Sequence, residues 1–336
     1  MKEIHDIELR HYNTFALPCV ADRMIVLEEE ADIPACAEKG WFRKPNFILS
    51  GGSNVLLGER YLGTVFHPVF KGAEVIQYSR NHVKVRVQAG VVWDDFVAWT
   101  VVNGFGGLEN LSLIPGYCGT APVQNIGAFG TEVCQHLLRV DGYMLPEGKK
   151  KSFKAAECHF GYRDSIFKND LKGRFIITST IYKLSLGKHH YRLDYGNLSD
   201  ALRGRHPGLS EIRQAVIDIR RSKLPDPQIA GNAGSFFKNP AVPIKKADEL
   251  KKKYPDIPLY PFNEKQVKVA AGWLIENAGW KGKTHQGAGV HGKQALVLVN
   301  LNNARADDIL ELAAMIQQSV NKEFGIVLEK EVNVIA

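Results

Sequence analysis

Hydrophobic and polar positions in the first 70 residues alternate as short strands around one helix. The apolar runs at 23–27, 47–50 and 64–66 each predict a strand, and the apolar spacing over 33–39 predicts a helix. We therefore expect a small α+β unit at the start of the chain.

The middle of the chain alternates more regularly. Val83, Val85 and Val87 are separated by polar residues, which predicts a strand with one buried face. A helix is expected over 93–102 and a long strand over 174–186. These elements predict a second, larger sheet with helical cover.

Helical patterns dominate the last third of the chain. Apolar residues recur on one face over 209–221, where Ser210 is placed as the N-cap, and the prolines of 224–227 end this helix. We expect a domain boundary there. Further helices are predicted at 246–253, 267–277 and 304–323, and strands at 295–300 and 325–335. The order lacks a regular βαβ alternation, which favours an α+β fold over a doubly wound sheet or barrel.

Composition agrees with a globular protein. The 336 residues, 45% of them apolar, suffice for two or three domains. The charged N-terminus is unlike a signal peptide, and no apolar run approaches the roughly 18 residues of a membrane span, so we expect a cytoplasmic protein without a membrane partner. Five scattered cysteines form no CxxC pair, which predicts reduced, mostly buried thiols. No HExxH motif or spaced His/Asp cluster occurs, so no metal is expected.

The formal charge of +7 favours anionic partners. The lysine runs at 149–151 and 251–253 are short and lack interleaved aromatic residues, so they are interpreted as solvated surface and no nucleic-acid partner is expected. Small phosphorylated ligands suit the same charge.

The segment GNAGSFFKNP at 231–240 presents one hydroxyl in a setting that packing does not explain. Its glycines let the backbone turn, which would hold Ser235 at a fixed place as a proton donor. Lys238 and Asn239 follow as a cation and an amide, a pair suited to an anionic substrate. An ordinary turn between two elements is the alternative.

Two glycine-rich regions are candidates for a nucleotide site. Gly51, Gly52, Ser53 and Asn54 follow an apolar strand, where consecutive backbone N–H groups form a nest for a pyrophosphate, although a plain turn has the same sequence signature. The region 104–130 is too long and too rich in small residues for a simple connection, and it would let a planar ligand lie against backbone. By contrast, 277–284 is a near miss for a phosphate-binding loop and is interpreted as a helix C-cap and turn.

Two charged segments complete the candidates. Arg163, between Tyr162 and Asp164, suits carboxylate recognition, and a structural ion pair is the alternative. In the terminal segment, Glu329 and Glu331 point to one face of the predicted strand, as they also would on an ordinary edge strand.

Taken together, these segments resemble the UDP-N-acetylenolpyruvoylglucosamine reductase family over nearly the whole chain. The resemblance rests on NTF at 13–15, LSGGSNVLL at 49–57, the glycine-rich 107–130 region, YRDSIF at 162–167, KLPDP with GNAGSFFKNP, AAGWLIENAG at 270–279 and LEKEV at 328–332. YGNL at 195–198 resembles the mobile tyrosine loop of the longer branch of this family. Several unlinked motifs in one order are more specific than any one of them.

The resemblance implies a fold, a reaction and its cofactors. The fold is an FAD-binding fold of the vanillyl-alcohol-oxidase type in two subdomains, at 1–70 and 71–224, with a smaller α+β substrate-binding domain at 225–324 and a returning terminal strand at 325–336. The reaction is the NADPH-dependent reduction of an enolpyruvyl UDP-sugar to UDP-N-acetylmuramate through FAD, by a protein expected to be monomeric.

The resemblance also assigns residues. Ser235 is implied to protonate the substrate, with Arg163 and Glu331 at its carboxylate. The residues implied to bind FAD are Gly51, Gly52, Ser53, Asn54, Ser112, Pro115, Gly116, Gly119, Thr120, Asn125, Ile126 and Gly127. Those implied to bind the substrate are Tyr195, Lys223, Asn239 and Gln294. Phe129 and Cys118 depart from the family pattern, where a tyrosine and a small apolar residue are usual.

Two other functions stay open at this point. An oxidase or dehydrogenase of the same fold could act on another small molecule, and a flavin- or nucleotide-binding protein could lack catalysis. The joint presence of Ser235, Arg163 and Glu331 argues against both.

Overall fold

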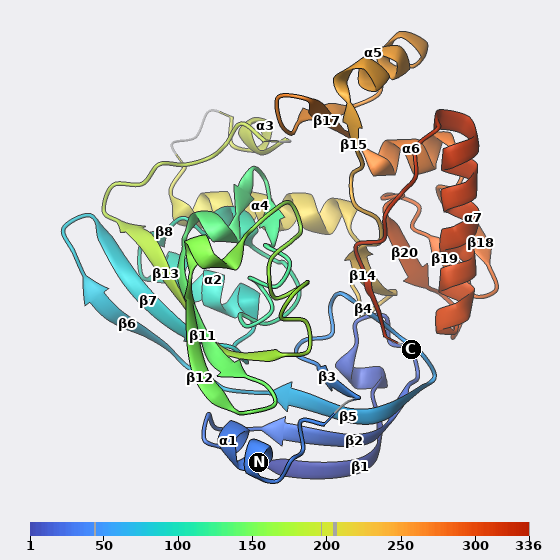
Figure 1. Cartoon of the computed structure of the whole chain (residues 1–336). Helices are drawn as coiled ribbons and strands as arrows, with labels where there is room; N and C mark the ends of the chain where they lie inside the picture. Colours follow the sequence, from blue (N-terminus) through green and yellow to red (C-terminus); the bar gives the residue numbers. More distant parts are fainter. Residues whose placement is uncertain (44, 196, 204–206, 336) are drawn as a thin grey trace. The chain divides into compact units, whose positions relative to one another are not determined.

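The computed structural model describes residues 1–43, 45–195, 197–203 and 207–335, and the chain divides into two compact units, each built from segments far apart in sequence (Figure 1). Unit 1 comprises Met1–Ile7, Ala21–Gly52 and Leu62–Ser222. Unit 2 comprises Glu8–Val20, Ser53–Tyr61 and Lys223–Ala336. Among the described residues, no helix combines the length and apolar character needed to cross a membrane.

The first sheet has four strands and belongs mostly to unit 1. Its order is β1 (Lys2–Glu8), β2 (Val20–Leu27), β5 (Arg60–Pro68) and β3 (Asn46–Ile48), and β3 pairs in parallel with β5. Helix α1 (Asp32–Glu38) connects β2 to β3 and buries Ile33 and Cys36. This is the α+β unit expected from the sequence.

The second sheet of unit 1 surrounds the long strand β13 (Phe175–Leu186). Its order is β12 (Lys149–Lys154), β11 (Leu137–Met144), β13, β7 (His82–Gln88) and β6 (Ala73–Tyr78), and β8 (Phe105–Gly106) pairs with β13. Helix α2 (Trp93–Val102) packs on this sheet, with the Trp93 and Phe96 rings 6.0 and 5.6 Å from that of Tyr182. These rings anchor the main core.

Shorter elements complete unit 1. They are β9 (Gly127–Ala128), β10 (Thr131–Glu132), α3 (Leu198–Ala201), α4 (Leu209–Lys223) and the 3₁₀ turns Glu109–Leu111, Val133–Gln135 and Ala155–Cys158.

Unit 2 combines two antiparallel sheets with three helices. One sheet has the order β14 (Gly231–Ser235), β20 (Val297–Asn300), β19 (Ala288–Val290) and β18 (Thr284–His285), and the other has β15 (Ala241–Pro243), β17 (Gln266–Val269) and β16 (Leu259–Pro261). The helices are α5 (Ile244–Lys253), α6 (Ala271–Asn277) and α7 (Ala306–Phe324). The terminal strand β21 (Asn333–Ile335) pairs in parallel with β4 (Val55–Leu57), and a 3₁₀ turn spans Arg10–Tyr12.

Most predicted elements are present, including α2, α4, β7 and β13, and four expectations are wrong. Residues 267–270 were expected to be helical, but Val267 and Val269 belong to strand β17 because they alternate with polar neighbours, and α6 begins only at Ala271. Ser210 lies inside the first turn of α4 and is not its cap. There, the Glu211 carboxylate accepts from the Gly208 amide (3.0 Å).

The other two corrections concern the site segments. The predicted terminal strand is shorter, because Gly325 with φ of +62° ends α7 and ladder pairing resumes only at Asn333. Residues 231–235, expected as a turn, form strand β14, although Gly234 keeps a left-handed φ of +70°. The serine therefore stands at the end of a strand.

Candidate functional site

The two glycine-rich regions meet within unit 1. A Cβ on Gly51 would lie 3.0 Å from the Gly116 Cα, and one on Gly119 would lie 2.6 Å from the Ala89 Cβ. Gly52 and Gly116 have φ of +57° and +119°, which glycine adopts most easily. At Gly51 and Gly116 the two loops therefore approach backbone to backbone, whereas Gly119 packs against Ala89, outside both loops. Left-handed residues such as Gly52 and Gly116 occur in loops whose successive backbone N–H groups form an anion-binding nest.

The polar side chains of the second region are bonded to their own loop or to residues that follow it in unit 1. The Ser112 hydroxyl donates to the Glu109 carbonyl (2.6 Å) and the Thr120 hydroxyl donates to the Tyr117 carbonyl (2.8 Å). The buried Asn125 amide donates to Glu132 and to the Gly161 carbonyl, and it accepts from the Cys134 amide. These side chains hold the loop in shape, so a cofactor would meet mainly backbone groups there, and the residues present fit an FAD.

Of the remaining predicted FAD residues, Ile126 is buried, whereas Pro115 is exposed. Ser53 and Asn54 lie in unit 2. Asn54 is bonded to the terminal segment, since its amide donates to the Glu331 carbonyl (3.4 Å) and its carbonyl accepts from both the backbone amide and the side chain of Asn333 (3.1 Å each). This group of bonds, the Asn54–Asn333 clasp, fixes the segment that carries Glu331.

Arg163 is held in a left-handed turn of unit 1 with φ of +55°. Its guanidinium donates to the Gly127 carbonyl (2.7 Å) and lies 5.4 Å from the Tyr162 ring. A Cβ on Gly127 would lie 3.0 Å from the Arg163 Nη1, so glycine makes room for the guanidinium. Arg163 is thereby tied to one of the predicted FAD residues.

Arg220, near Arg163, was not among the residues expected from the sequence to form the site. This arginine of α4 donates to the Leu113 carbonyl (3.1 Å), and burial lowers the pKa of its guanidinium to about 10, with the Asp94 charge opposing and the Arg163 charge adding to this shift. Its signal in the sequence was its spacing of three residues before Lys223, which places both on one face of the helix. Two neighbouring guanidinium groups favour an anionic ligand.

Within unit 2 the structure brings Ser235 and Glu331 together. The Glu331 backbone amide donates to the carbonyl of Phe236, the residue after the serine (2.8 Å). The next residue, Phe237, forms an isolated antiparallel β-bridge with Lys330. The side chains of Ser235 and Glu331 are both partly buried.

Glu329 differs from Glu331 in its surroundings. Its carboxylate is 76% exposed and lies 3.6 Å from the Lys238 ammonium. Lys238, proposed from the sequence to grip an anion, is therefore paired with a carboxylate of the same unit. Of the two glutamates, Glu331 is the one beside the serine segment and the clasp.

Asn239 and Gln294 approach the start of α6. The Asn239 side-chain oxygen accepts from the Ala271 amide (2.9 Å), which orients its NH₂ group. The Gln294 oxygen would lie 3.0 Å from a Cβ on Gly272. The structure therefore places both amides at one end of one helix.

The two remaining substrate-binding candidates are more exposed. Lys223 is the last residue of α4, and its side chain is exposed. Tyr195 is 48% exposed. It packs close to Gly130, where an added Cβ would lie 3.3 Å from the Tyr195 Cβ. The tyrosine loop expected at 195–198 includes residue 196, which is outside the described residues.

The two departures from the family pattern are accommodated by packing. The Phe129 ring packs on a cluster that includes Leu198 and Ile212, while its carbonyl accepts from the Asn110 amide (2.9 Å). Cys118 is fully buried, and burial raises the pKa of its thiol, with the Asp95 charge adding to the effect. All five cysteines are free thiols.

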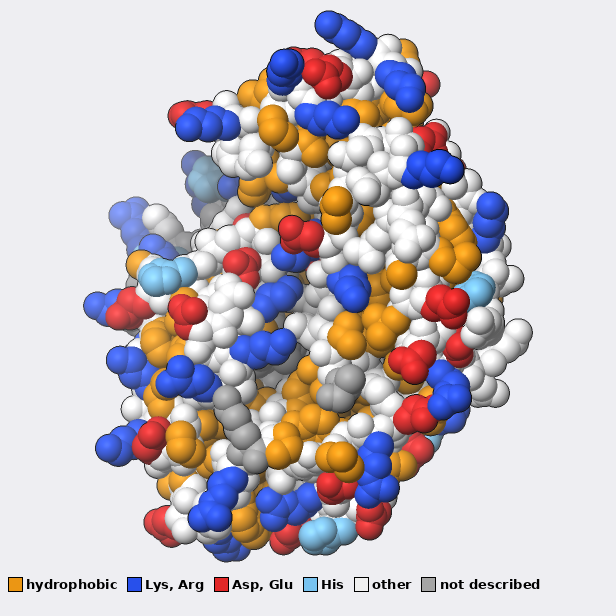
Figure 2. Space-filling model, turned by 45° about the vertical axis from the view of Figure 1, so that its right-hand side comes forward, with side chains coloured by type: hydrophobic (Ala, Val, Ile, Leu, Met, Phe, Trp, Pro, Cys, Tyr) orange, Lys and Arg blue, Asp and Glu red, His pale blue; other side chains and the backbone are white. Residues whose placement is uncertain are grey.

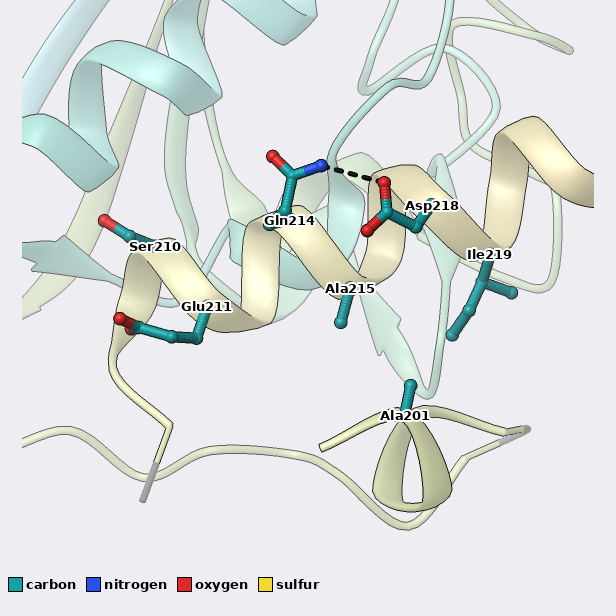
Figure 3. A pocket seen from close by; sticks show the side chains of 7 residues that line it. All are labelled: Ala201, Ser210, Glu211, Gln214, Ala215, Asp218 and Ile219. Atoms are coloured by element: carbon teal, nitrogen blue, oxygen red, sulfur yellow. Dashed lines mark hydrogen bonds between the residues drawn. The ribbon is translucent and has the colours of Figure 1, made fainter. Parts of the chain in front are cut away.

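A pocket of about 470 Å³ lies elsewhere in unit 1, between α3 and α4 (Figure 3). Its ionisable lining groups are the carboxylates Glu211 and Asp218, and Asp218 accepts from the Gln214 amide (2.8 Å). A pocket lined in this way repels the anionic ligands expected here. Figure 2 shows basic side chains mixed with carboxylates over the visible face, unlike the continuous basic stripe of a nucleic-acid site.

Comparisons with known proteins assign the family. A family model described as FAD binding domain matches residues 22–152, and one described as UDP-N-acetylenolpyruvoylglucosamine reductase, C-terminal domain, matches residues 226–335. The chain is 46% identical to the UDP-N-acetylenolpyruvoylglucosamine reductase of Flavobacterium johnsoniae, with 98% of each chain covered. It is 43% identical to that of Chromobacterium violaceum, with 97% of each covered.

A solved structure agrees in fold. The crystal structure of the UDP-N-acetylenolpyruvylglucosamine reductase from Thermus caldophilus matches with a TM-score of 0.67 at 23% identity, covering 100% of this chain and 98% of that one. The expected α+β fold with an FAD-binding domain is thereby confirmed. The chain belongs to the UDP-N-acetylenolpyruvoylglucosamine reductase family of FAD-dependent oxidoreductases.

Proposed function

We propose that this protein reduces UDP-N-acetyl-3-O-(1-carboxyvinyl)-glucosamine to UDP-N-acetylmuramate, a peptidoglycan precursor, with NADPH as hydride donor and FAD as carrier. Family membership over nearly the whole chain supports the reaction class. The observation that carries the chemistry is the hydrogen bond in unit 2 that holds the Glu331 backbone against Phe236, the residue after Ser235. We also propose a cytoplasmic monomer and the four-part division at 1–70, 71–224, 225–324 and 325–336.

FAD, when bound, supplies the two-electron chemistry, by accepting hydride from NADPH and passing it to the substrate. The residues proposed to hold it are the glycines of the two loops, Gly51, Gly52, Gly116, Gly119 and Gly127, with Ser53, Asn54, Ser112, Pro115, Thr120, Asn125 and Ile126. The positive φ of Gly52 and Gly116 supports contact through backbone amides. Their polar side chains act mainly by keeping the loop rigid.

The substrate carries negative charge on its carboxylate and on its diphosphate. Arg163 is assigned to its carboxylate, where a cation stabilises negative charge more in the transition state than in the ground state. Arg220, partly buried near Arg163, adds positive potential. Tyr195, Lys223, Asn239 and Gln294 are assigned to the uridine diphosphate, and the orientation of Asn239 by Ala271 supports its role.

Ser235 is assigned as the proton donor. Hydride addition turns the terminal carbon of the enol ether into a methyl group, and the adjacent carbon takes a proton from the serine hydroxyl, which recovers its proton from solvent. That carbon is strongly basic, so a serine of ordinary high pKa is acidic enough when it is well positioned. Glu331 is assigned with Arg163 to the substrate carboxylate.

The visible spectrum of the purified protein tests this proposal. We expect the yellow spectrum of bound FAD, bleaching with NADPH, and recovery on addition of the enolpyruvyl UDP-sugar without oxygen. Bleaching without recovery would favour another substrate of the same fold. A protein that takes up no FAD on reconstitution would contradict the whole proposal.

A further inference from the structure

The NTF motif near the start of the chain has no part in the function proposed above, yet it lies against the strand that ends in Ser235. Both belong to unit 2. The Thr14 hydroxyl donates to the Asn232 carbonyl (2.6 Å), and the Asn232 amide donates back to the Thr14 carbonyl (2.9 Å). Thr14 therefore holds Asn232 through two hydrogen bonds, across 218 positions of sequence.

Packing leaves this contact little freedom. A Cβ on Gly231 would lie 2.2 Å from the Phe15 carbonyl oxygen, so only glycine allows the approach. The same carbonyl accepts from the Asn300 amide (3.0 Å), and the Phe15 ring meets that of Phe236 edge-on at 6.4 Å. The buried side chain of Asn13 fixes the motif: its NH₂ group donates to the Leu9 and Leu17 carbonyls, and its oxygen accepts from the Leu17 amide.

Asn232 transmits the restraint to the serine. Its side-chain oxygen accepts from the Gly234 amide (2.9 Å), and its NH₂ group donates to the carbonyls of Ala230 (2.8 Å) and Pro225 (3.4 Å). Asn232 is 3% exposed, so water cannot easily replace these partners. The backbone entering Ser235 is thus fixed by one buried amide.

We infer that Thr14 is a positioning residue for the proton donor: by holding Asn232, its hydroxyl sets the place of the Ser235 Oγ. This inference rests on the proposed function of Ser235. Proton transfer depends on the placement of the acid, and a misplacement of about 1 Å can cost on the order of 10²-fold in rate. Thr14 acts through Asn232 and touches no reacting atom.

The test compares Thr14→Val with Thr14→Ser in the FAD-loaded full chain. Valine keeps the shape and removes the donor, whereas serine keeps the donor. For Thr14→Val we expect flavin reduction by NADPH within about twofold of the parent protein and reoxidation by the enolpyruvyl substrate slower by about tenfold or more. Thr14→Ser should restore reoxidation. Thr284→Val, at an exposed threonine of β18, is the matched control.

A double variant separates this inference from the proposed function. If Thr14 acts through the serine, Thr14→Val should slow reoxidation little further in a Ser235→Ala background. Additive losses, an equal loss in both half-reactions, or the same loss in Thr14→Ser would overturn the inference. If reoxidation is slow in Ser235→Ala but normal in Thr14→Val, only the inference fails. If reoxidation is normal in Ser235→Ala, the serine mechanism fails as well. Should the valine variant not fold, Thr14→Ala carries the same expectations.

Discussion

At the scale of single residues, the two glutamates of the terminal segment have different environments. Alternation along an extended segment put Glu329 and Glu331 on one face. The structure pairs Glu329 with Lys238 at the surface and places Glu331 beside the serine segment. Only the tertiary pairing of residues 236–238 with 329–331 separates them.

We expect Glu331→Gln to slow reoxidation of the flavin by the substrate about tenfold or more, because charge reorganises at the substrate carboxylate in that step. Glu329→Gln, which breaks a solvent-exposed ion pair, should change the rate by less than about threefold. Rapid-mixing measurements of flavin absorbance give both rates. The reverse ranking would transfer the role to Glu329.

At the scale of elements, the regular helices and strands were predictable, because apolar periodicity of 3.6 or 2 marks α2, α4, β7 and β13 directly. The site segments were not. Strand β14 contains two glycines and lacks an apolar alternation. The terminal segment does alternate, but its strand begins only at Asn333, and the Asn54 side chain binds the residues before it. Such elements depend on partners that are distant in sequence.

The Asn54–Asn333 clasp should control the order of one such element, the terminal segment that carries Glu331. Asn333→Ala removes a side-chain donor to the Asn54 carbonyl, which should loosen the segment that carries Glu331. We expect faster hydrogen exchange over 326–335 and a reoxidation rate lowered about threefold or more, with flavin reduction unchanged. Asn277→Ala, at an exposed residue ending α6, is the control. Unchanged exchange in the Asn333 variant would show that the clasp does not hold the segment.

At the scale of the whole molecule, the buried His67 and the half-buried His136 make the stability of unit 1 depend on pH. Burial lowers the pKa of His67 below its ordinary value of 6.5, with the Leu49 carbonyl opposing and the Lys71 charge adding to this shift. Burial also lowers the pKa of His136, with the Arg192 charge adding and a backbone hydrogen bond opposing. At pH values just below 6.5, each side chain is therefore more often neutral in the folded protein than in the unfolded chain.

Because the folded pKa values lie below the unfolded ones, the unfolded chain binds more protons and stability falls as pH drops below about 6.5. We expect the denaturant midpoint of unfolding to decrease between about pH 7 and pH 5, and the decrease to be smaller in His67→Gln. A midpoint that rises on acidification would contradict this assignment.

The central claim is that Ser235 donates a proton to the substrate in a flavin-dependent reduction. Its most direct measurement is rapid-mixing flavin absorbance of Ser235→Ala, recorded separately for the two half-reactions. We expect reduction by NADPH at the parent rate, and reoxidation by the enolpyruvyl UDP-sugar slowed by roughly 10² to 10⁴, with a smaller loss in Ser235→Cys, which keeps an ionisable proton. Near-normal reoxidation of the alanine variant would contradict the serine mechanism.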